Sequence, residues 1–328
     1  MNEKYIAVVD LGGTKILSAI ISTKGKILSR AKTSTVKNKK DKSDEVFIRI
    51  AETINSAIDK SQLKSDEIDA IVLGIPGSVN PNNGIVYLAP NLGWRNINVI
   101  EKLSKYFLTK ILIENDANLG TLGIANFGVA KNVKNFIALF IGTGIGAGIY
   151  INGEHYRGKN FAAGEIGHII VNSNGVKCGC GNYGCFETEA SRTAIARMIR
   201  EEIKNGRKSI VTKLTKNLSV IKSGIIKEAI KQKDKVTIKA VKYSAKKIGF
   251  VIGNLLNLLD IEMVVLAGGV TEAIGSFLLK EIKKEVKKVA LKSNYKGFKI
   301  KLSKLKDDSA LFGGLALYKN YKENEKIN

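Results

Sequence analysis

The sequence predicts an α/β protein in which helices pack on mixed sheets. Apolar strand-like runs alternate with amphipathic helical patterns along most of the chain, as is typical of sheets covered by helices. Two glycine-rich hairpins, Tyr5 to Ile21 and Phe136 to Ile151, begin the two halves of the chain and indicate a duplicated domain. A chain of 328 residues exceeds the usual size of a single domain, so two lobes are expected.

Each element follows from the spacing of its apolar residues. The stretch from Val46 to Lys60 places Phe47, Ile50 and Ile54 on one helical face, which predicts a helix. Ile68 to Gly77 is a mainly apolar run that ends in a Pro-Gly turn, which predicts a buried strand. The same arguments predict a helix over Val99 to Phe107, a strand over Lys110 to Asp116, a long helix over Ile238 to Leu259 and a strand over Ile261 to Gly269.

Two polar segments are expected to be disordered. One is the lysine-rich stretch from Val36 to Glu45, and the other is the tail after Tyr318. Both contain few apolar residues, so neither can bury enough apolar surface to offset the entropy lost on ordering.

The formal charge of +23 raises the question of a nucleic-acid partner. The lysines are spread over most predicted helices, and no recognition helix or aromatic-basic stripe is present. We therefore interpret them as solvated helix faces and expect no nucleic-acid partner. A basic surface can still attract anionic ligands such as nucleotides.

The sequence lacks the marks of export and of membrane insertion. It begins MNEKYIAVVD and enters an apolar strand at once, without the regions of a signal peptide. Its most apolar segments, such as Val251 to Leu259, contain polar residues and are too short to span a bilayer. We expect a cytoplasmic protein with no membrane partner, in which thiols stay reduced.

Three glycine-rich turns follow apolar strands. They are Asp10 to Lys15 (DLGGTK), Gly142 to Gly146 (GTGIG) and Ala267 to Gly269 (AGG). Phosphate groups need backbone N–H donors that no Cβ obstructs, and Thr14 and Thr143 can add hydroxyl donors. Each turn alone could be a simple tight turn, but together they favour phosphate binding. The P-loop pattern is absent, and GTGIG lies in a hairpin, which argues against a dinucleotide fold.

All three cysteines of the chain lie close to one of its two histidines. Cys178, Cys180 and Cys185 with His168 form the ligand set of a closed tetrahedral zinc site, although their spacing alone also fits three reduced core cysteines. The glycines between them favour metal, because a loop that points three thiolates inward must turn sharply. A closed site is structural, so this zinc would hold a loop. The other histidine, His155, is expected to be an ordinary surface residue.

These motifs and others resemble the ROK family (repressors, uncharacterised reading frames and kinases) of the actin/hexokinase superfamily. The matching stretches follow the family order over nearly the whole chain. They are DLGGTK, PG at 76–77, NLGW at 91–94, ENDAN at 114–118, GTGIGAG at 142–148, GEIGH at 164–168, CGCGNYGCFE at 178–187 and LAGGV at 266–270. The resemblance implies two ribonuclease-H-like (actin-like ATPase) domains with a cleft between them, and a homodimer.

The resemblance also implies where the domains divide. An N-terminal α/β domain at 1–116 would carry the sugar side and the first phosphate turn. A C-terminal α/β domain at 117–309 would carry the zinc loop and the nucleotide-binding turns. Residues 310–328 would pack back on the first domain.

Several residues receive roles from the resemblance. Asp116 would be the general base toward the attacking sugar hydroxyl, although its sequence context also fits a turn that caps a helix near Ala117. Asp10 would orient Mg²⁺ through water, and Lys15 would lie near the phosphates or simply at the surface. The implied sugar-binding residues are Gly77, Asn91, Asn115, Asp116, Glu165, His168 and Glu187. The implied nucleotide-binding residues are Asp10, Gly12, Gly13, Thr14, Lys15, Gly142, Thr143, Gly144, Gly146, Gly268 and Gly269.

The implied activity is ATP-dependent phosphorylation of a hexose at its 6-hydroxyl, glucose first, with Mg²⁺ and a structural Zn²⁺. One alternative is a kinase of N-acetylmannosamine or N-acetylglucosamine. A less favoured alternative is a sugar-responsive regulator, because such members carry a helix-turn-helix before the DLGGTK strand, which here begins at residue 5. Ala147 and Asn80 depart from the family pattern, where glycine and aspartate are frequent.

Overall fold

The structure is a computed structural model that describes residues 3–35 and 43–327. The disorder predicted for Val36 to Glu45 falls mainly on residues 36–42, outside the described residues. The chain divides into two compact units, each with its own hydrophobic core. Unit 1 comprises Met1–Asn132, His155–Ala163 and Asp307–Asn328, and unit 2 comprises Val133–Glu154 and Gly164–Lys306.

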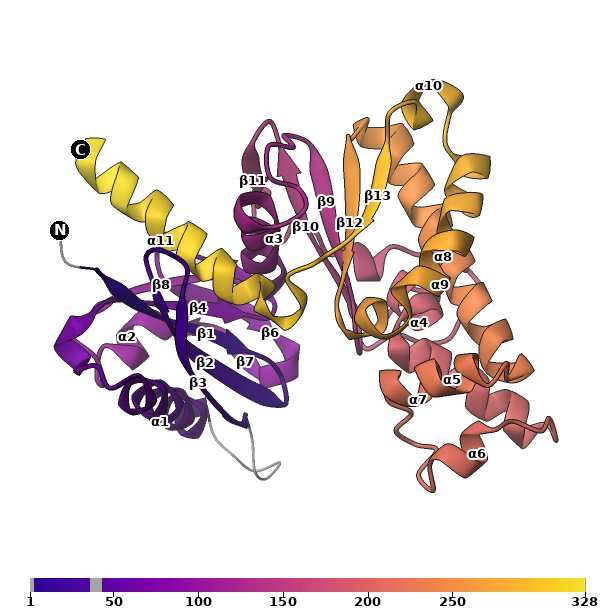
Figure 1. Ribbon diagram of the computed structural model, residues 1–328, viewed down its shortest axis with the longest axis horizontal. Helices are drawn as coiled ribbons and strands as arrows, with labels where there is room; N and C mark the ends of the chain where they lie inside the picture. Colours follow the sequence, from indigo (N-terminus) through magenta and orange to yellow (C-terminus); the bar gives the residue numbers. More distant parts are fainter. Residues whose placement is uncertain (1–2, 36–42, 328) are drawn as a thin grey trace. The chain divides into compact units, whose positions relative to one another are not determined.

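Unit 1 is built on a mixed sheet. Its strands are β1 (Tyr5–Leu11), β2 (Lys15–Ser22), β3 (Ile27–Ser34), β4 (Ile68–Ile75) and β8 (Lys110–Asn115). They are ordered β3-β2-β1-β4-β8, with β1, β4 and β8 parallel and β2 antiparallel to both of its neighbours (Figure 1). A smaller antiparallel sheet is formed by β5 (Ser78–Asn80), β6 (Ile85–Ala89) and β7 (Trp94–Asn98).

Helices cover both faces of the unit 1 sheet. The helical segments are α1 (Ser43–Ser61), η1 (Ser65–Glu67), η2 (Pro90–Leu92), α2 (Val99–Leu103), α3 (Asp116–Phe127), η4 (Lys306–Asp308) and α11 (Ser309–Ile327). In Figure 1, α1 lies on one face of the sheet and α11 on the other. Val9 of β1 packs in one core cluster with Phe47 of α1, whereas Val8 packs in another with Leu311 and Leu315 of α11. Because both faces are buried, β1 is almost continuously apolar.

The tail after Tyr318 is helical, so the prediction of disorder was wrong. It continues α11, whose apolar side already packs on β1 and β4. Helices α11 and α3 also approach closely at glycines. A Cβ on Gly313 would lie 1.7 Å from the carbonyl oxygen of Leu119, and one on Gly123 would lie 2.0 Å from that of Ser309. The polar residues of the tail lie on the exposed side of an anchored helix.

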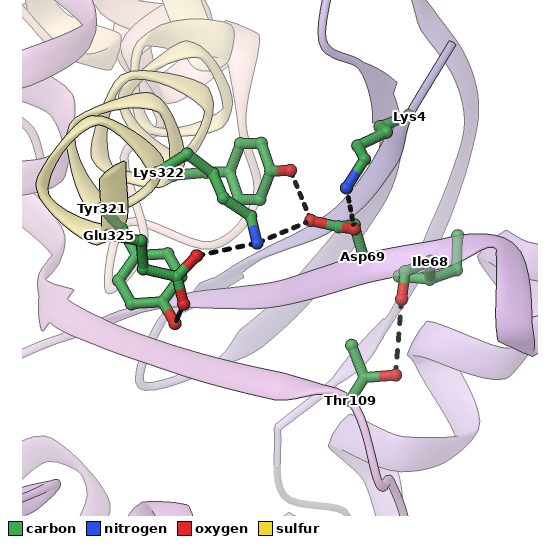
Figure 2. A network of polar contacts seen from close by, with 8 residues as sticks. Lys4, Ile68, Asp69, Thr109, Tyr321, Lys322 and Glu325 are labelled. Atoms are coloured by element: carbon green, nitrogen blue, oxygen red, sulfur yellow. Dashed lines mark hydrogen bonds and ion pairs between the residues drawn. The ribbon is translucent and has the colours of Figure 1, made fainter. Parts of the chain in front are cut away.

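A polar network connects α11 with Asp69 of β4 and with Lys4, the residue before β1 (Figure 2). The Asp69 carboxylate accepts hydrogen bonds from Lys4 Nζ at 2.7 Å and from the Tyr318 hydroxyl, and it lies 3.4 Å from Lys322 Nζ. Partial burial acts to raise the pKa of Asp69, but the Lys4 and Tyr318 hydrogen bonds and the Lys322 charge lower it overall. The network therefore stabilises the folded state while Asp69 is ionised.

Unit 2 repeats this plan. Its strands are β9 (Phe136–Ile141), β10 (Ile145–Ile151), β11 (Glu154–Tyr156), β12 (Met263–Ala267) and β13 (Lys299–Leu302). Their order is β11-β10-β9-β12-β13, with β9, β12 and β13 parallel. The helical segments are η3 (Ile166–His168), α4 (Phe186–Ala190), α5 (Arg192–Lys204), α6 (Val211–Leu214), α7 (Ser223–Lys231), α8 (Lys235–Leu259), α9 (Gly269–Val289) and α10 (Lys292–Tyr295).

Both predicted hairpins are present. Leu11 pairs with Ile16 across the turn between β1 and β2, and Ile141 pairs with Ile145 across the turn between β9 and β10. One core cluster of unit 2 joins α5, α8 and α9 to β9 and β12. Among the helices of residues 3–35 and 43–327, none combines the length and apolar character that a membrane crossing requires.

We predict that Asp69→Asn lowers the free energy of unfolding at pH 7 by roughly 1 kcal/mol, because a neutral amide weakens the Lys4 and Tyr318 hydrogen bonds and loses the Lys322 ion pair. Urea denaturation followed by circular dichroism measures the change. Glu323→Gln, at an exposed carboxylate on α11, is the matched control and should change stability little.

The pH dependence gives a second readout of the same variant. The pKa of Asp69 is lowered in the folded state, so its contribution is present above the unfolded pKa and is lost as the pH falls through the folded pKa. The wild-type and Asp69→Asn proteins should therefore become equally stable in acid. Equal stability already at pH 7 would show that the network contributes nothing.

Candidate active site

The predicted residues of unit 1 meet at one edge of its sheet. In the strand register Asp10 of β1 pairs with Gly74 of β4, and Gly74 pairs with Glu114 of β8. These strands are parallel, so the residues after their carboxyl ends share this edge. Gly77 follows β4, and Asp116 follows β8. Ligand crevices in α/β proteins form at such edges.

The first glycine-rich turn is closed by backbone and side-chain hydrogen bonds. Gly12 N donates to Lys15 O at 2.8 Å, and the Thr35 hydroxyl donates to Gly12 O at 2.6 Å. Asn91 lies against this turn, because a Cβ on Gly13 would be 3.1 Å from the Asn91 Cβ. The structure therefore brings a predicted sugar residue beside a predicted phosphate turn.

Asp10 is half-buried at the start of this turn. The pKa of the Asp10 carboxyl is raised overall, mainly because of its burial. The charge of Asp307 also raises this pKa, whereas the charge of Lys15 lowers it. A buried carboxylate is ionised more easily beside a cation. The position therefore fits the Mg²⁺-orienting role that the family resemblance implies.

The turn from β8 to α3 fixes Asn115 and presents Asp116. Asn115 Oδ1 accepts from Asn118 N at 3.0 Å, which makes Asn115 the cap of α3, and its Nδ2 donates to Gly77 O at 2.9 Å. Asp116 occupies the first helical position, where its Oδ1 accepts from Ala117 N at 2.8 Å. The principal cap is therefore Asn115.

Gly77 must be glycine at this place. Its φ is +96°, and a Cβ would lie 2.1 Å from the carbonyl oxygen of Leu88. The carbonyl oxygen that accepts the hydrogen bond from the Asn115 amide is that of Gly77. A larger residue at this position could not form the turn.

The two glycine turns of unit 2 are neighbours. Gly142 N donates to Gly144 O at 2.9 Å and closes the turn between β9 and β10. Gly268 has a φ of +89°, and a Cβ there would lie 2.7 Å from the carbonyl oxygen of Ile141. Gly269 then begins α9, whose N-terminus can attract an anion. The backbone donors of GTGIG and AGG therefore meet at one edge of the sheet.

Side chains from α4 and α5 brace the GTGIG turn. Glu187 Oε2 accepts from Ile145 N at 3.0 Å, and the Thr193 hydroxyl donates to Thr143 O at 2.7 Å. Arg192 Nη2 donates to the Thr143 hydroxyl at 2.6 Å, which puts a cation beside the turn. Sequence reasoning missed Arg192, because no pattern links it to a residue so distant in the chain.

The four predicted metal ligands come together in unit 2. The ligand atoms of His168, Cys178, Cys180 and Cys185 all lie within 4.8 Å of one another. Cys178 Sγ is 3.7 Å from His168 Nδ1, and Cys180 Sγ is 3.6 Å from Cys185 Sγ. Zinc–sulfur bonds of about 2.3 Å in a tetrahedron separate the ligands by roughly 3.8 Å, so the cluster fits a four-coordinate metal.

The loop holds these ligands by its turns and its burial. Gly184 has a φ of +68° and lies against Asn172, so this position also requires glycine. A hydrogen bond from the Asn182 backbone lowers the pKa of Cys180, whereas burial raises the pKa of Cys185 to about 12. A metal must displace the Cys185 proton, so its binding depends on pH.

The metal cluster adjoins two of the predicted sugar residues. His168 Nδ1 faces the thiols, and its Nε2 lies 3.9 Å from Glu165 Oε2. Glu187 follows Cys185 at the start of α4. A metal in the cluster would therefore help to fix Glu165, which faces the imidazole, and the start of α4, which carries Glu187.

His155 is buried, so the prediction of a surface residue was wrong. Its side chain is 3% exposed, and neither ring nitrogen has a hydrogen-bond partner among the described residues. Burial, with the nearby Arg157 charge, lowers its pKa to about 3, so the ring is neutral. His155 Nδ1 lies 4.0 Å from Oε2 of the fully buried Glu114. The polar residues around His155 in the sequence did not reveal this contact.

Comparison with known proteins identifies the family. The ROK family profile matches residues 6–321. The chain belongs to the ROK family. It is 33% identical to the glucokinase of Halalkalibacterium halodurans, over 100% of this chain and 99% of the relative. It is 32% identical to the xylose repressor of Caldicellulosiruptor bescii, over 80% of this chain and 66% of the relative.

A solved ROK structure supports the same conclusion. The glucokinase of Streptomyces griseus in complex with glucose and AMPPNP is 27% identical, with a TM-score of 0.82 over 95% of this chain and 98% of that chain. The ROK resemblance is thereby confirmed. So is the predicted fold class of ribonuclease-H-like, actin-like ATPase α/β domains.

We predict a stability change with pH that depends on His155. Its pKa is about 3 when folded and near 6.5 when unfolded, so its contribution is full above pH 6.5 and is lost as the pH falls toward 3. From pH 7 to pH 5 the wild type should lose about 2 kcal/mol more than His155→Phe, which cannot take up a proton. Urea denaturation at both pH values measures this difference, and identical losses in the two proteins would contradict it.

Proposed function

We propose that this ROK-family protein transfers the γ-phosphoryl group of ATP to the 6-hydroxyl of a hexose, with glucose as the preferred sugar. The observation that carries the proposal is the position of Asp116 at the carboxyl edge of parallel strands, beside the fixed Asn115 amide. The similarity to a glucokinase over its whole length supports glucose.

Asp116 would act as the general base. Its carboxylate takes the proton of the sugar hydroxyl as that oxygen attacks the γ-phosphorus, and ADP leaves. As the first residue of α3, it is held by the backbone of a helix that is capped by Asn115. Asn91, Glu165, His168 and Glu187 would bind the sugar hydroxyls.

The nucleotide would bind through backbone donors and cations. The GTGIG and AGG turns offer N–H groups to the phosphates, and Arg192 adds a positive charge beside Thr143. Asp10 would orient Mg²⁺, which supplies charge neutralisation at the transferred phosphoryl group when it is bound. Lys15, close enough to Asp10 to influence its pKa, would lie near the same phosphates.

Zinc is the metal that we propose for the Cys3His cluster, in a structural role. Four protein ligands leave no open position, so the ion would hold the loop and activate no water. Homodimerisation and a cytoplasmic location stay predictions from the sequence.

Two alternatives remain for the same set of residues. An N-acetylmannosamine or N-acetylglucosamine kinase would differ only in the space beside the 2-position of the sugar. The similarity to a xylose repressor over 80% of this chain favours a sugar-binding regulator as the second candidate. Two measurements separate the glucokinase, the N-acetylhexosamine kinase and the regulator. One is sugar-dependent ADP release with glucose, mannose and both N-acetylhexosamines, and the other is operator-DNA binding at physiological salt.

For Asp116→Asn we predict a fall in kcat of roughly 10² to 10⁴-fold with a much smaller change in KM for glucose. The amide keeps the shape and the Ala117 contact but cannot accept the proton. Steady-state kinetics on the folded variant measure both constants. Because Asn115 is the main cap, a purely structural role of Asp116 predicts a near-normal kcat, and that result would remove Asp116 from the mechanism.

For the metal we predict about one zinc per chain in protein purified without chelator. Cys180→Ser should lose the zinc and weaken sugar use, because Glu165 and Glu187 lose their shared anchor. Elemental analysis and KM for glucose provide the readouts, and Asn174→Ser, at an exposed position in the same loop, should retain both. Full activity of metal-free wild type would contradict the structural role.

A further inference from the structure

We propose that Glu114 is a positioning residue for Asp116 and that Arg157 is the counter-ion that makes this possible. The inference rests on the proposed function, in which Asp116 is the base. Glu114 is buried and Arg157 is half-buried. Neither side chain contacts the reacting groups in the mechanism proposed above.

Glu114 belongs to a closed ring of hydrogen bonds around Asp116. Its Oε1 accepts from Asn115 N at 2.9 Å and from Asn118 Nδ2 at 3.2 Å. The ring closes because Asn115 Oδ1 accepts from Asn118 N at 3.0 Å. Asp116 lies in the chain between these residues, so the ring fixes the direction in which its side chain leaves the backbone.

The ring depends on a carboxylate that is fully buried. The Glu114 side chain is 0% exposed, and burial of a carboxylate is costly unless it is paired with a cation and hydrogen-bonded. Arg157 supplies the charge through two contacts with Oε2, from Nε at 2.8 Å and from Nη2 at 2.7 Å. Oε2 of Glu114 therefore pairs with Arg157, whereas Oε1 binds Asn115 and Asn118.

No second cation replaces Arg157 in the described part of this cluster. His155 is the other titratable group near Glu114, with Nδ1 at 4.0 Å from Oε2, and its ring is neutral. Asn118, from α3, faces the carboxylate with an uncharged amide. Loss of Arg157 therefore leaves the buried Glu114 carboxylate without its ion pair, and any rotation away from its present position weakens the bonds to Asn115 and Asn118.

A small shift of the base has a large kinetic effect. A misplacement of about 1 Å can reduce a rate by roughly 10²-fold, even when its cause is remote from the chemistry. Substrate binding spreads over many other groups and should change little. A positioning role therefore predicts a loss in kcat that is not matched in KM.

The test compares Arg157→Gln with Asp69→Asn, which weakens the same unit at a site outside the proposed machinery. We expect kcat of Arg157→Gln to fall at least 10-fold, with KM for glucose and for ATP changed less than about 3-fold. Asp69→Asn should keep the wild-type kcat. Arg157→Lys, which keeps the charge without the forked donors, should recover part of the rate.

The outcomes separate this inference from the proposed function. If the wild type phosphorylates no hexose, the proposed function fails. If the wild type is active and Arg157→Gln keeps its kcat, or if Asp69→Asn loses as much, the positioning role is overturned. Should Arg157→Gln not fold, Glu114→Gln is measured in its place. It keeps the shape but holds the ring more weakly, so an unchanged kcat overturns the inference equally.

Discussion

Parallel pairing of strands is the constraint on which the rest of the structure depends. Because β1, β4 and β8 run in the same direction, Asp10, Gly77 and Asp116 share one edge although long stretches of chain separate them. The same pairing of β9 and β12 brings the GTGIG and AGG turns together. In each unit, strand pairing therefore brings the residues of the candidate site to one edge of the sheet, and side-chain contacts then position them.

Side-chain contacts then hold the turns at these sheet edges in position. In unit 2 the segment after Cys185 runs directly into α4 and α5, whose side chains hold the GTGIG turn. The Cys3His cluster and the GTGIG turn are therefore joined by one continuous segment of chain. In unit 1 the equivalent support is electrostatic, through Glu114 and its arginine.

The sequence allowed the strands, the hairpins and the grouping of the three cysteines with His168 to be predicted, because each has a local signature in apolar spacing, glycine or cysteine. It did not reveal the Glu114–Arg157 pair, the burial of His155 or the contact of Arg192 with Thr143. Those contacts join residues far apart in the chain, so no local pattern records them. The helical tail after Tyr318 was missed for a related reason, since Tyr318 and Lys322 are held by Asp69, which lies far away in the sequence.

The place of α11 also determines the order in which the protein can fold during synthesis. Leu311 and Leu315 cover a face of the sheet that contains β1, so the ribosome makes the two sides of this core at widely separated times. All segments of unit 2 have left the ribosome before α11. The unit translated first is therefore the last to close its core, and its apolar face on β1 must stay protected until then.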